Sequence, residues 1–282
     1  MKSMHAFLYI FLLFFLIQPF RAMADNKSVR MQTETPKDRR MQVNPPRISR
    51  KKYEENERKY RHLHIRIRQS LPSKHGNITG RLVSPDKVRS CGASFYQAME
   101  KLPDSFVRRS GVRYVCFMQE LWVNKKPAGG VASGDTIYLK VNFPAHTVYH
   151  ELFHVFDPQY ENRKWTRLNP KGFLYTGSNF YEIDFTRSKQ KQVDDNLKYK
   201  RFDNDFVSRY AMSFEREDRA STFACMIDEG PRFLERARKS PVIRQKMLFI
   251  IEMTEGHKLM GRDFWEKHLR IKTNDVRNLL KR

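Results

Sequence analysis

The sequence predicts an α+β fold in which a small mixed or antiparallel sheet precedes a group of C-terminal helices. Segments rich in β-branched and aromatic residues cluster between residues 112 and 141, and helical periodicity dominates after residue 214. Strands and helices do not alternate, which argues against a parallel doubly wound sheet. Hydrophobic residues make up 40% of the 282 residues and aromatic residues 13%. This composition supplies a core and excludes an intrinsically disordered chain.

The N-terminal 24 residues are typical of a secretory signal peptide. Lys2 precedes an apolar run over residues 6–17, and Ala22-Met23-Ala24 supplies the small residues of an A-x-A cleavage site. We therefore predict cleavage after Ala24 and a secreted or periplasmic protein. An uncleaved membrane anchor is the alternative.

Positive charge is spread along the chain, with 54 Lys and Arg against 31 Asp and Glu, a net charge of +23. Residues 25–78 are basic and polar, so we predict a largely flexible N-terminal segment that contacts anionic surfaces. Within it, residues 51–61 favour a solvated helix and residues 63–67 an edge strand, whereas residues 69–90 are expected to form loops. A solvated basic surface without a dedicated ligand is the alternative. No nucleic-acid-binding motif is recognisable in the sequence.

The compact domain is predicted over residues 79–282. Pro144 can open a helix that Asp157-Pro158 ends. The glycine-containing segment 129–134 forms either a hairpin turn or an edge strand to which an extended peptide could pair. The other expected elements are a helix at residues 95–102, strands at 112–123 and 135–141, and helices at 214–228, 232–239, 242–253 and 262–269.

An exported chain meets an oxidising compartment, which permits one disulfide among its three cysteines. Cys91 and Cys116 are nearest in sequence, but spacing alone does not set the pairing. Cys225 lies in an apolar helical pattern that is typical of a buried thiol.

The motif with the clearest chemistry lies in the helix that ends before Pro158. It reads His150-Glu151-Leu152-Phe153-His154, an H-E-x-x-H sequence. Residues i and i+4 lie on one helix face, so the two imidazoles can bind a single Zn²⁺. Glu151 is offset from that pair and is placed to act as a general base. Two core histidines without a metal are the alternative.

A zinc site of this kind needs a third protein ligand. The metzincin pattern fails, because Asp157 and Tyr160 stand where glycine and histidine would follow. Glu217 is the best candidate, because it lies on the inward stripe of a predicted helix, where a carboxylate is costly unless a cation neutralises it. That stripe also contains Ala220, Phe223 and Ala224. The alternative is an acidic cluster stabilised by the helix dipole, formed by Glu215, Glu217 and Asp218.

A second motif follows the histidines. Tyr210 precedes Glu217 by seven residues, and Glu217 opens an E-x-x-A-x-x-F helix. With the H-E-x-x-H motif and Asp157, this pattern resembles the catalytic domains of lethal-factor-type gluzincins. It is also similar to zinc-binding metallopeptidases of bacteria, over roughly residues 110–226. The resemblance implies a zincin-like domain with zinc bound by His150, His154 and Glu217.

The resemblance also implies roles for neighbouring residues. Glu151 would be the catalytic base, and the Tyr210 hydroxyl would stabilise the developing oxyanion. Lethal-factor-like helices carry a second Glu four residues after the ligand, whereas this chain has Ser221. Asp157 is an alternative orienting residue, because ligand histidines donate their other N–H group to a carboxylate or carbonyl.

The sequence therefore predicts a secreted zinc metalloendopeptidase acting on peptide or protein substrates, and its basic charge favours acidic ones. His146 lies one turn before His150, but three consecutive turns do not reach one ion, so we do not expect it to be a ligand. Two other classes remain. One is a non-peptidase zinc protein, with a structural metal or another amide as substrate, and the other is a catalytically inactive basic binding module.

Overall fold

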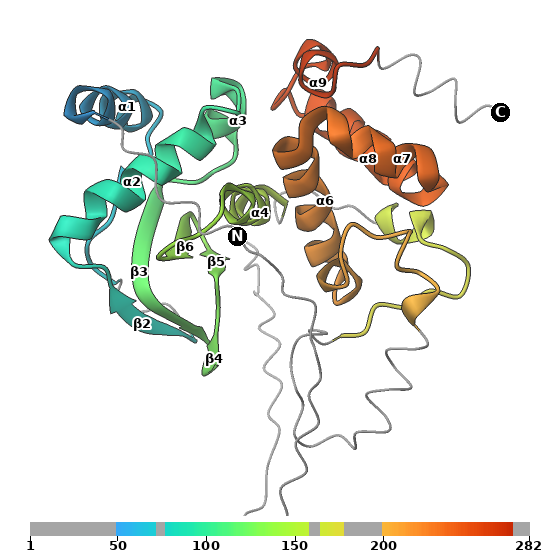
Figure 1. The fold of residues 1–282 in the computed structure, drawn as a ribbon, viewed down its shortest axis with the longest axis horizontal. Helices are drawn as coiled ribbons and strands as arrows, with labels where there is room; N and C mark the ends of the chain where they lie inside the picture. Colours follow the sequence, from blue (N-terminus) through green and yellow to red (C-terminus); the bar gives the residue numbers. More distant parts are fainter. Residues whose placement is uncertain (1–48, 72–76, 158–163, 178–198, 273–282) are drawn as a thin grey trace, which may run out of the picture. The chain divides into compact units, whose positions relative to one another are not determined.

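The computed structural model describes residues 49–71, 77–157, 164–177 and 199–272, all of which fall within one compact unit, Val43–Arg282. The fold is α+β, as predicted, with a small mixed sheet followed by mainly helical structure (Figure 1). The predicted signal peptide lies outside the described residues. Among the helices of the described ranges, none is long and apolar enough to cross a membrane.

The long strand β3 (Tyr114–Val123) is the centre of the six-stranded sheet. Strands β1 (Arg66–Ile67) and β6 (Thr136–Lys140) run parallel to it on opposite sides. Strand β5 (Gly130–Ser133) pairs antiparallel with β6 and ends the order β1-β3-β6-β5. The glycine-containing segment therefore forms an edge strand.

Both faces of β3 are buried, which explains why its sequence lacks a polar alternation. Val115 and Phe117 point into the main core, and Cys116 and Met118 point into a smaller cluster on the opposite face. Two short strands, β2 (Ile78–Leu82) and β4 (Lys126–Pro127), pair antiparallel with the second half of β3.

Helix α1 (Arg50–His62) packs on helix α2 (Pro85–Met99) through aromatic rings. Tyr60 stacks on Tyr96 with 5.2 Å between ring centroids, and Tyr53 lies 5.6 Å from the same ring. The expectation of a helix solvated on all sides is wrong, because two tyrosines seven residues apart share one face. This part of the N-terminal segment thus contributes to the core.

The expectation of loops over residues 69–90 is also wrong for the second half of that range, which contains β2 and the start of α2. Gly80 suggested a loop, but it sits within β2 with φ +150°, and a Cβ there would lie 2.0 Å from the Glu120 carbonyl oxygen. The glycine permits a close approach between two strands. Pro85 opens α2 instead of ending a segment.

Helix α4 (Ala145–Phe156) carries the H-E-x-x-H motif and begins directly after Pro144, as predicted. Val148 and Leu152 are fully buried, and the Tyr149 hydroxyl donates a hydrogen bond to the Ala98 carbonyl oxygen at 3.0 Å. Packed against β5, β6, α2 and α6, this helix holds the motif between the sheet and the C-terminal helices (Figure 1).

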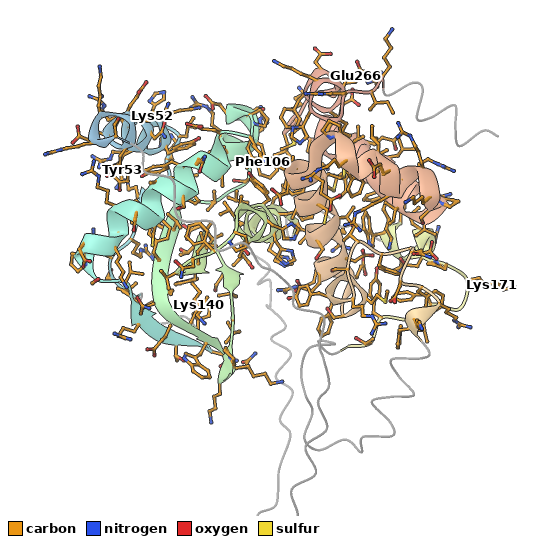
Figure 2. The ribbon with its side chains drawn as sticks, viewed as in Figure 1. Lys52, Tyr53, Phe106, Lys140, Lys171 and Glu266 are labelled. Carbon is orange, nitrogen blue, oxygen red and sulfur yellow. The ribbon has the colours of Figure 1, made fainter. Side chains whose placement is uncertain are left out.

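The C-terminal helices occupy the predicted ranges closely. Phe106 of α3 (Asp104–Arg109), labelled in Figure 2, stacks on Phe223 at 5.2 Å, and Phe223 lies 4.8 Å from Phe153 of α4. Through these rings, helices α3, α4 and α6 pack on one another in the core. The elements after α4 are η2 (Trp165–Leu168), η3 (Tyr210–Met212), α6 (Glu215–Glu229), η4 (Gly230–Arg232), α7 (Phe233–Lys239), α8 (Pro241–Gly256) and α9 (Arg262–Leu269).

The chain's three cysteines all lie in the described ranges. Cys91, Cys116 and Cys225 are buried free thiols. The disulfide that export would permit is therefore not formed in this structure. Burial raises the pKa of Cys116 to about 11 and that of Cys225 to about 12, so both stay protonated and unreactive at neutral pH.

Candidate metal centre

Three buried side chains from two helices converge at one point. His150 and His154 lie one turn apart on α4, and Glu217 lies in the first turn of α6. The His150 Nε2 atom is 3.0 Å from His154 Nε2 and 3.0 Å from Glu217 Oε2, which is 3.1 Å from His154 Nε2. The structure thus brings together the three residues predicted as ligands.

This donor set fits a zinc ion. Ligand atoms held 2.0–2.1 Å from a tetrahedral Zn²⁺ are about 3.3 Å apart, close to the sides of the observed triangle. Two imidazoles and one carboxylate also form the protein ligands of known catalytic zinc sites. Within the described ranges, the group consists of these three residues.

The protonation states of His150 and Glu217 suit metal binding. Burial lowers the pKa of His150 to about 4, so its imidazole is neutral at neutral pH and keeps a free lone pair. Burial alone would raise the pKa of Glu217, but hydrogen bonds to His150 and His154 hold it below its usual range. Glu217 is therefore an anion facing the neutral imidazole of His150 and the Nε2 atom of His154.

Glu151 lies beside this triangle and faces the edge strand β5. A Cβ atom at Gly130 would lie 2.8 Å from Glu151 Oε1, so the glycine makes room for the carboxylate. Burial raises the pKa of Glu151 to about 7, although His154, Arg216 and a hydrogen bond to the backbone of Ala132 oppose the rise. A carboxyl with a pKa near neutrality can both accept and return a proton. Nothing in the sequence had indicated that Gly130 lies beside Glu151.

Tyr210 reaches the same site from η3. Its ring centroid is 5.8 Å from that of His150. Burial raises the pKa of its hydroxyl, and the charge of Glu217 together with a hydrogen bond to that residue raises it further. The hydroxyl therefore keeps its proton and can act as a hydrogen-bond donor.

Asp157, the alternative orienting residue, forms an ion pair with a residue of α6. It lies at the C-terminal end of α4 and accepts two hydrogen bonds, each 2.7 Å long, from Nε and Nη2 of Arg219. Arg219 also donates to Glu215. This buried pair joins the two ligand-bearing helices. Ser221 is the residue beside a ligand histidine, with its Oγ 3.5 Å from His150 Nδ1.

Asp218 belongs to the acidic cluster that was the alternative interpretation of Glu217, and its side chain is fully buried. Its Oδ2 atom accepts hydrogen bonds from Trp165 Nε1 at 2.9 Å and from the Tyr175 hydroxyl at 2.8 Å, and it lies 2.7 Å from Lys246 Nζ. The available signal was Lys246, a cation that directly precedes the apolar run of α8.

His146 stays outside the ligand group, as expected, with its ring centroid 6.4 Å from that of His150. Burial lowers its pKa. It extends the row of histidines along α4 without joining the triangle.

Comparison with known proteins leaves the chain without an assigned family. The sequence matches no model of a known protein family and no curated protein. Among solved structures, a "putative zinc-binding metallo-peptidase" from Bacteroides caccae is similar, with a TM-score of 0.48 and 16% sequence identity over 82% of this chain and 96% of that chain. With a TM-score below 0.5, this likeness carries no argument about function.

Proposed function

We propose that the chain is a zinc-dependent metallopeptidase that hydrolyses peptide bonds. The observation that carries this proposal is the convergence of His150, His154 and Glu217 with Glu151 beside them. Two imidazoles, an ionised carboxylate and an adjacent carboxyl with a pKa near neutrality form a complete set of ligands and base for metal-assisted hydrolysis.

Each residue has a distinct task in this proposal. His150, His154 and Glu217 would hold the zinc ion, which when bound acts as a Lewis acid and lowers the pKa of water. Glu151 accepts a proton from the attacking water at its carboxylate and delivers it to the leaving amine. Tyr210 donates a hydrogen bond to the carbonyl oxygen as negative charge develops there, in the role that the gluzincin resemblance implies.

The edge strand β5 gives the substrate a place to lie. It ends the sheet order, and Gly130 and Ala132 both lie next to Glu151. An extended peptide can pair with such an edge through main-chain hydrogen bonds. Pairing there would carry the scissile carbonyl past the catalytic base.

A purely structural zinc site is less well supported. Structural zinc ions have four protein ligands, whereas three residues of the described ranges form the group. An inactive binding module is also disfavoured, because Glu151 retains the position of a base. The predicted signal peptide supports action outside the cytoplasm, in a secreted or periplasmic setting.

The test is cleavage of a diverse peptide library by the zinc-loaded protein, read by mass spectrometry beside its Glu151→Gln variant. We expect cuts by the wild type alone, abolished by a chelator and restored by zinc, while the variant still binds one zinc ion per chain. Wild-type turnover by Glu151→Gln would show that the base is another residue. A folded, zinc-loaded wild type that cuts no peptide would contradict the proposed activity.

A further inference from the structure

Arg216 occupies a position in α6 that opposes the helix dipole. It lies in the first turn, where the N-terminal partial positive charge disfavours a cation. Violations of such local preferences are expected mainly at functional sites. Arg216 directly precedes the ligand Glu217, so its placement calls for a reason other than helix stability.

The contacts of Arg216 leave most of its guanidinium available. Its Nε atom donates to Glu217 Oε1 at 3.3 Å, while Glu217 Oε2 faces the two imidazoles. The Arg216 side chain is 63% exposed, against 9% for Glu217. Within the described ranges no further hydrogen bond or ion pair involves Arg216, and both terminal amino groups can reach a ligand from solvent.

The charge of Arg216 also affects the pKa of two other residues of the site. Burial raises the pKa of Glu151 and of Tyr210, and the charge of Arg216 opposes both rises. Arg216 therefore lies within electrostatic range of the proposed base and the proposed oxyanion donor. It stands at the solvent side of the site in which the peptide bond would react.

With zinc bound, the site would keep a positive charge on its solvent side. The two positive charges of a zinc ion would be offset by the carboxylate of Glu217 and by that of Glu151 in its ionised form. Arg216 then leaves one exposed positive charge beside the reacting bond. The planar fork of an arginine matches a carboxylate in two parallel hydrogen bonds.

We propose that Arg216 binds a carboxylate of the substrate close to the scissile bond and so selects acidic substrates. This inference rests on the proposed peptidase function and assigns a substrate class to that same site. The carboxylate comes either from an Asp or Glu side chain or from the free C-terminus of a peptide. Both sources share the chemistry that Arg216 recognises.

The test uses matched peptides chosen from the cleavage sites that the library reveals. One pair differs only by Glu or Gln at each position flanking the cut, and another only by a free or amidated C-terminus. We expect the wild type to cut the carboxylate member about 10- to 100-fold faster in kcat/KM, the usual size of a hydrogen bond to a charged group. The pair that shows the difference identifies the source.

Variants then assign the preference to one side chain. Arg216→Gln should remove the difference within the responsive pair, Arg216→Lys should keep part of it, and Arg216→Glu should reverse it. Arg61→Gln is the matched control, because it removes the same charge from an exposed arginine on α1. Equilibrium binding of the same peptides to zinc-loaded Glu151→Gln, with and without Arg216→Gln, should show the same ratios without turnover.

Two outcomes would overturn the inference while leaving the peptidase intact. In one, wild type and Arg216→Gln show equal Glu-to-Gln and free-to-amidated ratios in cleavage and binding. In the other, Arg216→Gln slows all peptides alike. A zinc-loaded wild type without any cleavage would instead remove the proposed function, and the inference with it.

Discussion

Glu217 and Asp218 are consecutive carboxylates of α6, and both are buried, yet they have opposite surroundings. Glu217 faces the imidazoles of His150 and His154 and, from the solvent side, the exposed Arg216. Asp218 has three partners within the chain at its Oδ2 atom, namely Lys246, Trp165 and Tyr175.

The difference shows which carboxylate needs a ligand from outside. A buried anion must be paired or hydrogen-bonded, since desolvation is otherwise too costly. Asp218 has an ammonium group 2.7 Å away. Within the described ranges, the Lys or Arg side chain paired with Glu217 is Arg216, which is 63% exposed, and the imidazole of His150, with a pKa near 4, is neutral at neutral pH. A divalent metal held by Glu217 and the two histidines would add positive charge inside the site.

The largest effect is expected from removing the ligand carboxylate. Glu217→Gln should weaken zinc affinity by more than about 100-fold, beyond the 10- to 100-fold typical of outer partners, because one of three ligands loses its charge. Zinc content and competition with a chelator measure this, with Glu215→Gln as the control on the same helix turn. Unchanged affinity would place the third ligand elsewhere.

Asp218→Asn should instead damage the fold. It leaves Lys246 buried without its anion, and breaking a buried pair from one side costs about 3–5 kcal/mol of unfolding free energy. Urea denaturation measures the loss. Adding Lys246→Met should recover part of it, because the orphaned charge is then removed. A double variant no more stable than Asp218→Asn would argue against the ion pair as the cause.

Removing the metal should distinguish the role of Glu217 from that of Asp218. At zinc concentrations 100-fold above Kd, binding stabilises the folded state by about 2.7 kcal/mol, so a chelator should lower the melting temperature of the wild type. Asp218→Asn should melt at a lower temperature than the wild type but still show this zinc-dependent shift. Glu217→Gln should lose the shift. Thermal melts with and without zinc provide the measurement. A zinc-dependent shift that persists in Glu217→Gln would contradict the proposal that Glu217 binds the metal.

A smaller effect is expected at Trp165. Trp165→Phe removes one donor to Asp218 and should cost about 1–3 kcal/mol of stability, the usual range for a charged acceptor losing a hydrogen bond. Zinc affinity should stay at the wild-type value, since Glu217 is untouched. A large loss of zinc would mean that the Asp218 cluster also positions the ligand.

The smallest effect is expected from Ser221→Ala. The Ser221 hydroxyl lies 3.5 Å from His150 Nδ1, at the limit of a hydrogen bond. Zinc affinity should fall by less than about tenfold, below the usual cost of losing a strong outer partner. A greater fall, seen in the same chelator competition, would show that Ser221 orients the ligand histidine when metal is bound.

Several elements could be predicted because their signals are local. Pro144 and the apolar spacing through Phe156 predicted α4, and the i, i+4 spacing placed His150 and His154 on one face. The apolar stripe around Glu217 predicted its inward position. The buried face of α1 and the start of α2 were missed, since both depend on neighbours distant in the chain.

The sequence by itself determined which residues could act together on a metal, because helical periodicity sets the spacing of His150, Glu151 and His154 and turns Glu217 inward. Only the tertiary structure decided that Asp218 is paired by Lys246, that Gly130 makes room for Glu151, and that Asp157 binds Arg219. These contacts join residues separated by at least 20 positions. Such contacts depend on how helices and strands pack, which local periodicity does not encode.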